Sequence, residues 1–316
     1  MLAMAKVNNE SVLMQDLREI PDLKVKLAEP LARYASMKIG GPADFFVEVE
    51  NGAALAQLLP LLKRHRTPLC FLGNGSNVLI SDRGVRGAVI HLAGDFKRAE
   101  WKEEGEVVWL EVGAACALTQ LVREAARKGY AGLEFAEGIP GTVGGALVMN
   151  AGAYGSEFEK IVDGVEGLDA DGRAIRYSRE DMTFSYRDSH WPVGAVVTRV
   201  RMRLRKEEAT QVSSKVHALV AKRKSSQPSG YPNSGSMFRN PPGDFAGRLI
   251  EAAGLKGKRI GQAQISERHA NFIVNLGGAR AEDVYRLMDL ARAEVKKRFA
   301  VELLAEVKLL GEWDAE

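Results

Sequence analysis

The sequence has few of the features that staple a protein together or anchor it in a membrane. It contains only two cysteines, Cys70 and Cys116, and neither stands in a metal-type spacing. This excludes a disulfide framework and a cysteine-rich zinc site, so we expect two buried free thiols. No apolar run approaches the ~20 residues that a membrane helix needs. The first twenty residues carry charges throughout and lack the apolar stretch of a secretory signal, so we expect a cytoplasmic protein.

The sequence also lacks a strong charge of either sign. The formal net charge is +3 at pH 7, and no basic motif with interleaved aromatic residues is present. A nucleic-acid partner is therefore not expected, whereas small anionic substrates are compatible with this charge. Hydrophobic residues make up 46% and charged residues 27% of the 316 residues, which excludes wholesale disorder. A chain of this length is expected to form two or three domains without any staple.

Glycine is abundant in one segment, residues 137–155, which reads EGIPGTVGGALVMNAGAYG and holds six glycines. Glycine suits places where the backbone adopts positive φ or approaches another group closely. We expect Pro140 to fix a turn and Thr142 to cap a short helix over residues 143–150. The free N–H groups of that helix would favour an anion such as a pyrophosphate. A tightly packed structural turn explains the segment equally well when it is taken alone.

A second glycine-rich segment is the turn Gly73-Asn74-Gly75-Ser76-Asn77. Its small residues can direct several backbone N–H groups at one anion. It is not a Walker loop, because no Gly-Lys-Ser/Thr follows, and it is not a Rossmann fingerprint, because residues 78–80 are strand-like. A tight hairpin without a ligand remains the alternative. The two segments together favour a bound dinucleotide.

The pattern of apolar residues predicts an α+β chain with short connections. Residues 1–30 are expected to form a helical arm. Strands are expected at residues 45–49, 107–112, 162–168, 174–177, 195–204, 262–265, 272–275 and 303–310, with three short strands and their turns in residues 68–92. Helices are expected at residues 53–65, 118–127, 207–224, 245–253 and 281–299. The last helix has acids in its first turn and bases in its last, which matches the helix dipole.

Three polar features are not explained by local pattern. The loop FSYRDS at residues 184–189 contains an arginine, and a solvated loop is its simplest interpretation. Residues 225–243 read SSQPSGYPNSGSMFRNPPG, which resembles a linker in composition but also holds large apolar residues that flexible linkers avoid. We interpret this segment as an ordered functional loop. Glu306 interrupts the strand expected at residues 303–310, and by alternation it would simply point to solvent.

The ordered set of these motifs resembles the flavin-dependent UDP-N-acetylenolpyruvoylglucosamine reductases of bacterial cell-wall synthesis. The resemblance extends from about residue 34 to residue 311 and rests on SMKIGGPADF, LGNGSNVLISDRG, EGIPGTVGGALVMNAGAYG, FSYRDS, NSGSMFRNPPG and LLAEVKLLG. It implies an α+β fold, with a two-part FAD-binding region of the vanillyl-alcohol-oxidase/PCMH type followed by a smaller α+β substrate-binding domain. The implied divisions are an N-terminal extension at residues 1–30, FAD-binding subdomains at 31–93 and 94–206, and a substrate-binding domain at 207–316.

The resemblance also implies the site residues. It places the catalytic groups at Arg187, Ser236 and Glu306. It implies that FAD is held by Gly73, Asn74, Gly75, Ser76, Asn77, Gly138, Ile139, Pro140, Gly141, Gly144, Gly145, Asn150 and Gly152. None of the five histidines lies in the two glycine-rich segments, so we expect the FAD to be non-covalent. Contacts to the substrate's uridine, phosphates or sugar are implied for Tyr154, Lys224, Arg239 and Asn240.

The implied reaction has two halves that share one site. NADPH would deliver a hydride to the flavin, and the enolpyruvyl ether of the UDP-sugar would then receive it at C3. Arg187 would pair with the carboxylate, Ser236 would protonate C2, and Glu306 would orient the site or share a proton. The implied partners are UDP-N-acetylglucosamine enolpyruvate and NADPH, with no obligate protein partner.

Some details depart from the family's pattern, and two alternatives remain. Ser36 and Lys38 stand where Thr and Arg are common, and no aromatic-rich insertion lies between residues 186 and 225, as in the shorter subtype. A flavin oxidase or sugar-acid dehydrogenase could use the same FAD scaffold, but would lack the loop around Ser236 together with Glu306. A nucleotide-binding module without catalytic activity is the second alternative.

Overall fold

The computed structural model describes residues 2–313, with side chains from residue 11 onward. The chain divides into two compact units that interleave along the sequence. The first unit contains Met1–Leu27, Phe45–Gly73 and Gly87–Val220, and the second contains Ala28–Asp44, Asn74–Arg86 and Ala221–Glu316. The first unit contains two hydrophobic clusters and the second unit contains one.

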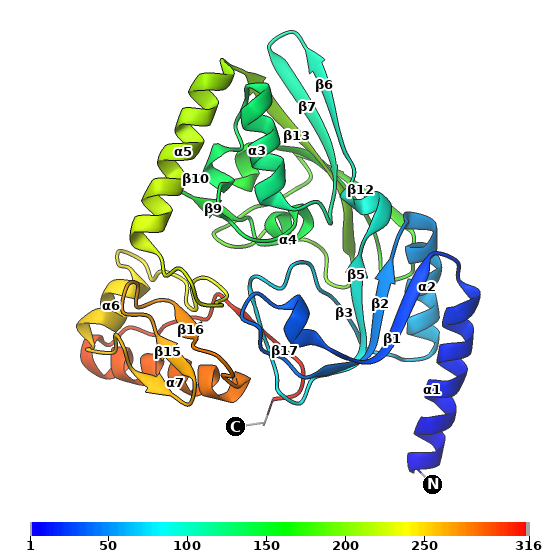
Figure 1. Cartoon of the computed structure of the whole chain (residues 1–316). Helices are drawn as coiled ribbons and strands as arrows, with labels where there is room; N and C mark the ends of the chain where they lie inside the picture. The colour runs from blue at the N-terminus through cyan, green and yellow to red at the C-terminus, as the bar shows by residue number, and fades with distance from the viewer. Residues whose placement is uncertain (1, 314–316) are drawn as a thin grey trace. The chain divides into compact units, whose positions relative to one another are not determined.

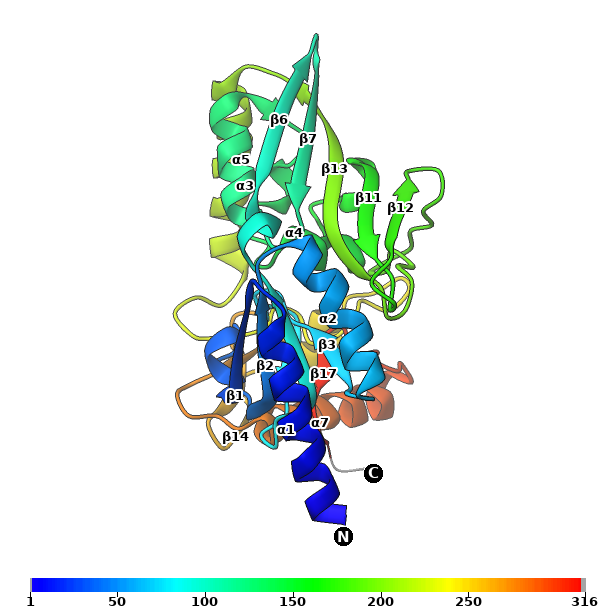
Figure 2. The same cartoon turned by 90° about the vertical axis from the view of Figure 1, so that its right-hand side faces the viewer.

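A four-stranded sheet forms early in the chain, in the order β1-β2-β5-β3. Its strands are β1 (Leu23–Pro30), β2 (Pro42–Val49), β5 (Val85–Leu92) and β3 (Leu69–Phe71), the last parallel to β5. In the first unit, α2 (Gly52–Arg64) buries Leu55, Leu58 and Leu62 in the same apolar cluster as β2. Helix α1 (Leu2–Glu19) lies beside α2 in Figures 1 and 2 and adds Leu13 and Leu17 to this cluster.

A six-stranded sheet forms the rest of the first unit, and Figure 2 shows its longer strands in a row. The order is β12 (Ala174–Ser178), β11 (Val162–Leu168), β13 (Val196–Lys206), β7 (Val107–Gly113) and β6 (Ala99–Glu104), with β8 (Tyr130–Ala131) also paired to β13. Alternation along β13 buries Val200, Met202 and Leu204, while Arg201 and Arg203 are exposed. The buried side chains pack with α3 (Leu118–Lys128) and α5 (Ala209–Ser226), whose ribbons lie side by side in Figure 1.

Short elements complete the first unit between α3 and β11. They are α4 (Val143–Val148), β9 (Gly152–Ala153) and β10 (Ser156–Glu157), with the last two forming a small antiparallel pair. Helix α3 ends at Gly129, whose φ of 72° gives the left-handed cap that glycine accommodates. After α3 the chain forms β8 and a short 3-10 helix, Glu134–Ala136, before it enters the glycine-rich segment that contains α4.

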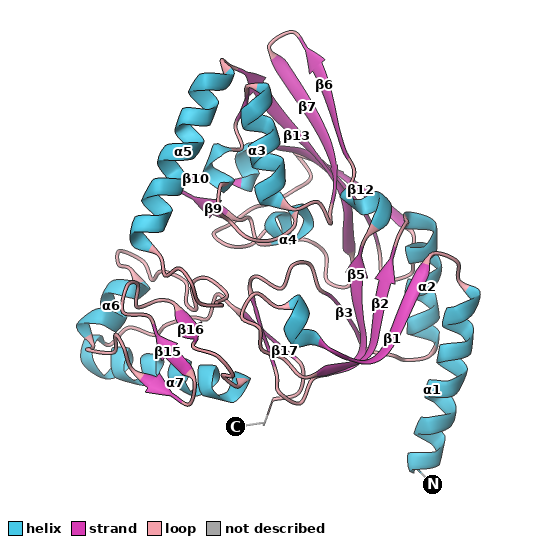
Figure 3. Cartoon of the chain, in the orientation of Figure 1, coloured by secondary structure: helices cyan, strands magenta, loops and turns pink. Residues whose placement is uncertain are grey.

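The second unit is built around α7 (Ala281–Phe299), which lies along the small sheet β14 (Arg259–Ile260), β15 (Ala263–Ile265) and β16 (Ile273–Asn275), coloured magenta in Figure 3. Leu287 and Met288 of α7 are fully buried with Leu249 of α6 (Ala246–Ala252). Strand β17 (Lys308–Leu310) pairs in parallel with β4 (Val78–Ile80). Asp82 caps α7, because its carboxylate accepts the N–H groups of Ala281 at 3.0 Å and Glu282 at 3.2 Å.

Most predicted elements are confirmed to within two or three residues, and α7 has the predicted bounds. Three predictions are wrong in extent. The arm at residues 1–30 contains α1 but also strand β1, and the helix predicted at 143–150 ends at Val148. The strand predicted at 303–310 is only β17, because Phe238 pairs with Ala305 and the N–H of Glu306 donates to Met237 O instead of continuing a ladder. Strand β6 was not predicted, since its sequence AEWKEE is largely polar.

Candidate active site

The two glycine-rich segments meet within the first unit at Gly73 and Thr142. A Cβ atom on Gly73 would lie 2.8 Å from Thr142 Oγ1, closer than real Cβ atoms approach, so a side chain at Gly73 would displace the threonine. Thr142 is buried and caps α4, as predicted, because its Oγ1 accepts the N–H of Gly145 at 3.3 Å. This contact therefore joins Gly73, the first residue of the segment 73–77, to Thr142, the residue that caps α4 in the segment 137–155.

Hydrogen bonds hold the backbone of the loop before α4, while Pro140 and Gly145 remain exposed. Gly138 and Gly141 have φ of 73° and 134°, conformations that disfavour other residues. Leu118 N donates to Gly141 O at 3.1 Å, and Val143 N donates to Cys116 O at 3.0 Å, so the loop is tied to the residues that precede α3. A Cβ on Gly144 would lie 2.8 Å from that of Ala114, whereas Gly145 is exposed. Gly144 is thus a packing glycine, and Gly145 keeps the helix surface open.

The remainder of the second glycine-rich segment, residues 74–77, belongs to the second unit. Gly75 has φ of 58°, and a Cβ there would lie 2.3 Å from Tyr34 O, so only glycine fits. Ser36 of the SMKIGGPADF motif holds the loop, because its N–H donates to Gly75 O at 3.0 Å and its hydroxyl to Asn74 O at 3.4 Å. Asn74 is exposed, while Ser76 and Asn77 are partly buried.

Each loop, taken by itself, is compatible with an anionic cofactor such as FAD. Gly75 in one loop, and Gly138 and Gly141 in the other, have the positive φ found in turns that direct backbone N–H groups at an anion. The cysteines do not contribute reactive thiolates, since burial raises the pKa of Cys70 to about 11 and also raises the pKa of Cys116. Among the described residues, no group of three or more His, Cys, Asp or Glu side chains is placed to hold a metal ion.

Two of the three predicted catalytic residues lie on paired segments of the second unit. Ser236 forms an isolated bridge with Phe272, and the next residue, Met237, accepts the N–H of Glu306 at 2.8 Å. Asn77 Nδ2 donates to Glu306 O at 3.2 Å. Ser236 and Glu306 are both partly buried. The structure therefore brings this serine and this glutamate into one small constellation with Asn77 of the second glycine-rich segment.

Asn271 holds the serine segment, a role that was not recognised from the sequence. Its side chain is buried, its Oδ1 accepts Phe238 N at 3.0 Å, and its Nδ2 donates to Phe238 O at 2.8 Å. Its own carbonyl accepts Met237 N at 2.8 Å. The signal in the sequence is a single amide at the start of the otherwise apolar run 270–274, since a buried polar side chain needs partners.

The third predicted catalytic residue, Arg187, lies in the first unit on a two-residue turn. Ser185 and Asp188 exchange backbone hydrogen bonds of 2.8 and 3.1 Å on either side of the turn. Arg187 has φ of 62°, is partly buried, and its guanidinium carbon lies 5.0 Å from the centre of the Tyr186 ring. Ser185 Oγ lies 3.1 Å from His190 Nε2. The loop FSYRDS is thus an ordered hairpin and not a solvated coil.

The other predicted residues occupy varied positions. Tyr154 is exposed, and its hydroxyl donates to Leu219 O at 3.4 Å. Lys224 is exposed in the last turn of α5. Arg239 is partly buried, and Asn240 uses its Oδ1 to accept the N–H of Ala246 at the start of α6, at 3.1 Å. Ile139 is partly buried and Pro140 exposed beside Gly138, and Gly152 lies in β9. Asn150 is completely buried, with its amide bonded to protein groups.

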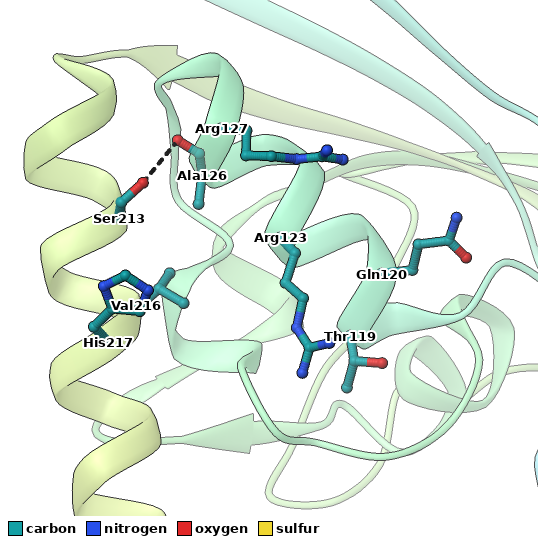
Figure 4. A pocket seen from close by; sticks show the side chains of 8 residues that line it. All are labelled: Thr119, Gln120, Arg123, Ala126, Arg127, Ser213, Val216 and His217. Atoms are coloured by element: carbon teal, nitrogen blue, oxygen red, sulfur yellow. Dashed lines mark hydrogen bonds between the residues drawn. The ribbon is translucent and has the colours of Figure 1, made fainter.

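A separate pocket of about 470 Å³ lies between α3 and α5 (Figure 4). Its lining is Thr119, Gln120, Arg123, Ala126, Arg127, Ser213, Val216 and His217, none of which is a predicted site residue. Ser213 Oγ donates to Ala126 O at 3.4 Å, the dashed line in Figure 4. Arg123 also lies 3.5 Å from the buried carboxylate of Glu137. Through Arg123, the pocket therefore borders Glu137, the first residue of the glycine-rich segment 137–155.

No described helix has the length and apolar character required to cross a membrane.

Comparisons with known proteins agree with this arrangement. Residues 43–178 match the family model of an FAD binding domain, and residues 227–310 match that of the UDP-N-acetylenolpyruvoylglucosamine reductase C-terminal domain. The chain is 47% identical over 289 residues to UDP-N-acetylenolpyruvoylglucosamine reductase 2 of Symbiobacterium thermophilum, covering 91% of this chain and 92% of that protein. It is 46% identical to the reductase of Heliobacterium modesticaldum, covering 90% of each chain.

A solved structure is similar over nearly the same range. The crystal structure of UDP-N-acetylenolpyruvylglucosamine reductase from Thermus caldophilus has a TM-score of 0.78 and 40% sequence identity, covering 91% of this chain and 98% of that one. Together with the two family models, this likeness confirms the predicted fold class: an FAD-binding region followed by a smaller α+β domain.

Proposed function

Because the chain belongs to the UDP-N-acetylenolpyruvoylglucosamine reductase family, we propose that it is a flavin-dependent oxidoreductase of peptidoglycan precursor synthesis. It reduces UDP-N-acetylglucosamine enolpyruvate to UDP-N-acetylmuramate. The structural observation that carries this proposal is the constellation of Ser236, Glu306 and Asn77, in which an acid and a hydroxyl are held beside a glycine-rich loop. A flavin oxidase on the same scaffold would have no use for this pair.

The cofactor of the proposal is FAD, held without a covalent bond, with NADPH as the hydride donor. The match of residues 43–178 to an FAD-binding domain supports the first of these. When bound, the flavin would accept a hydride from NADPH and transfer it to the enolpyruvyl double bond. The residues proposed to hold it are Gly73, Asn74, Gly75, Ser76, Asn77, Gly138, Ile139, Pro140, Gly141, Gly144, Gly145 and Gly152. Asn150 was also predicted to bind FAD, but all of its side-chain N–H donors are bonded to protein groups.

Arg187 has the task of holding negative charge. Hydride addition at C3 of the enolpyruvyl group places charge on C2 and on the adjoining carboxylate. A guanidinium can meet a carboxylate with two parallel N–H bonds, and it strengthens its hold as charge develops. Its position on a rigid hairpin, stacked on Tyr186, reduces the rotamer freedom it would otherwise lose on binding.

Ser236 supplies the proton to C2, and Glu306 orients it. A serine hydroxyl is a weak acid, so its transfer requires a charged environment that stabilises the developing alkoxide or restores the proton. Glu306 is on the segment paired with Met237, the residue after Ser236, which makes it suited to organise such a relay. Tyr154, Lys224, Arg239 and Asn240 are proposed contacts for the UDP-sugar, with Asn240 limited by its cap on α6.

The proposal also includes the domain division, the location and the partners of the protein. We retain the proposed division into residues 1–30, 31–93, 94–206 and 207–316, in which the matches at 43–178 and 227–310 lie on either side of the last boundary. Cytoplasmic location and the absence of an obligate protein partner are part of the same proposal, because the substrate is a soluble nucleotide sugar.

A flavin assay under anaerobic conditions tests the proposal. The purified protein is expected to show an oxidised flavin spectrum, and NADPH should bleach it faster than NADH does. A colourless protein, or a flavin that NADPH does not bleach, would favour a nucleotide-binding module. Rapid reoxidation by oxygen, without any response to the enolpyruvyl sugar, would favour an oxidase.

A further inference from the structure

We propose that Asn150 is a positioning residue that holds the turn bearing Arg187, and that its side chain is not a cofactor ligand. This inference rests on the proposed function, in which Arg187 pairs with the substrate carboxylate. Asn150 follows α4 within the glycine-rich segment, and this location in the sequence suggested a direct role in binding FAD. Its contacts point instead to the segment that leads into the Arg187 turn.

The side chain of Asn150 is fully enclosed and its donors are fully used. Its exposed fraction is 0%. One Nδ2 hydrogen is donated to Glu157 Oε2 at 3.1 Å, and the other to Ser185 O at 3.1 Å. Its Oδ1 accepts the N–H of Glu159 at 3.0 Å. A primary amide has only two N–H donors, so none is left for a cofactor.

Both ends of the Arg187 turn are tied to the residues that end α4. Ser185, which precedes the turn, accepts from Asn150 through its carbonyl. Ser189, which follows it, donates to Val148 O from its backbone N–H and from its hydroxyl, each at 3.2 Å. The Ser185–Asp188 backbone pair then closes the turn. The residues at the end of α4 therefore position Arg187, while the first turn of the same helix belongs to the proposed cofactor loop.

The backbone of this region needs such support. Nine non-glycine residues in the described part of the chain have positive φ, and four of them lie here: Asn150 at 39°, Tyr154 at 54°, Arg187 at 62° and His190 at 48°. Such conformations are unfavourable for residues with a Cβ and persist only where surrounding contacts impose them. In the turn itself, Arg187 occupies a position at which glycine or asparagine is normally favoured. Loss of the Asn150 bonds would let the turn relax and move the guanidinium.

A second set of contacts, made by Arg179 and Glu159, stabilises the loop that bears Arg187 and includes a bond to Asn150. Arg179 donates to Glu159 Oε1 at 2.7 Å, and its guanidinium carbon lies 5.0 Å from the centre of the Phe184 ring. Glu159 is also the residue whose N–H is accepted by Asn150. Asn150 thus joins the Glu157–Glu159 segment to the start of the hairpin, and Arg179 braces the same two segments.

The test is a double-mutant cycle on the two half-reactions. In Asn150→Ala, flavin content and bleaching by NADPH should stay near those of the wild type, while reoxidation by the enolpyruvyl sugar slows by about 10²-fold, the scale of a misplaced group. The double variant Asn150→Ala/Arg187→Ala should be no slower than Arg187→Ala, because Asn150 acts only through the arginine. Ser189→Ala, which keeps one of its two bonds to Val148, should slow the same step by a smaller factor.

The outcomes separate this inference from the proposed function. Losses of Asn150→Ala and Arg187→Ala that multiply in the double variant, or a fall in flavin content, would overturn the positioning role. Near-normal reoxidation by Arg187→Ala itself would overturn the proposed function instead. Asn51→Ala is the matched control: Asn51 caps α2 by accepting Ala54 N at 2.9 Å, so its loss lowers stability without slowing the second half-reaction. A slowdown there equal to that of Asn150→Ala would mean that general destabilisation explains both.

Discussion

Ser236 is a weak acid on a firmly held backbone. The bridge to Phe272 and the bonds from Asn271 to the two following residues fix its main chain, while its side chain remains partly accessible. This is the arrangement that proton donation to a bound substrate requires, because a misplaced hydroxyl would lose the advantage of proximity.

Ser236→Ala should therefore separate the two half-reactions. Reduction of the flavin by NADPH should stay nearly intact, since no proton from the serine is needed there. The second half-reaction should slow by at least ~10², the low end for a lost general acid. Rapid-mixing absorbance of the flavin measures both steps. Equal slowing of the two steps would contradict the role of Ser236 as proton donor.

Arg187→Lys tests whether the planar fork of the guanidinium is required. A lysine ammonium keeps the positive charge but cannot form two parallel bonds to a carboxylate, and it has no planar face for Tyr186. Turnover should fall by about 10²-fold, as for loss of one donor that stabilises developing charge. Steady-state turnover of the enolpyruvyl sugar measures this. Retention of near-normal turnover would mean that the arginine is misassigned.

Single residues show where prediction from sequence ends. The roles of Arg187, Ser236 and Glu306 rest on family resemblance. Local pattern alone suggests solvated positions for Arg187 and Glu306, and for Ser236 only an ordered loop. Asn150 and Asn271 help to hold two of these segments, and each bonds to a residue 33 to 35 positions away along the chain, Ser185 and Phe238. No local pattern encodes such partners, because the fold brings them together.

At the scale of elements, α1 is attached to α2 by charge as well as by its leucines. Asp16 Oδ2 lies 2.7 Å from His65 Nε2 and 3.2 Å from an Arg64 nitrogen. The hydrogen bond with His65, followed by that with Arg64, lowers the pKa of Asp16 below its ordinary value of 3.8. A lowered folded-state pKa means that the carboxylate stabilises the docked helix above its unfolded-state pKa, and that this contribution is lost as pH falls through the folded-state pKa.

Asp16→Asn should accordingly weaken the docking of α1 at neutral pH but not in acid. At pH 7 the variant should show lower hydrogen-exchange protection factors than the wild type for the backbone amides of residues 11–19. The difference should shrink as the pH falls below about 4, where the wild-type carboxylate is itself protonated. Equal protection of both proteins at pH 7 would contradict a role for this carboxylate in docking α1.

The elements also differ in how well their bounds can be predicted from their own sequence. The bounds of α7 followed from its apolar period and from charges suited to both ends, and Asp82 supplies the cap that the chain before α7 lacked. Strand β17 could not be delimited, because an alternating run predicts a strand but not its partner. The segment around Glu306 pairs instead with the serine loop, which the sequence places some 70 positions earlier.

At the scale of the whole molecule, the fold class was predictable and the interleaving of the two units was not. Six motifs in one order identified the family, and the matches at residues 43–178 and 227–310 agree with it. The second glycine-rich segment, however, divides between the units after Gly73, so residues 74–77 and Ser236 share one compact unit with residues 28–44. A sequence pattern groups elements that are close along the chain. It therefore does not predict that each unit is built from three separate segments.

Reoxidation of the reduced flavin by the enolpyruvyl sugar is the decisive test of the proposed reaction. The protein would be reduced anaerobically with one equivalent of NADPH and then mixed with UDP-N-acetylglucosamine enolpyruvate. The account predicts stoichiometric return of the oxidised spectrum with formation of UDP-N-acetylmuramate, and no response to UDP-N-acetylglucosamine, which lacks the double bond. A flavin that stays reduced in the presence of the enolpyruvyl sugar would contradict it.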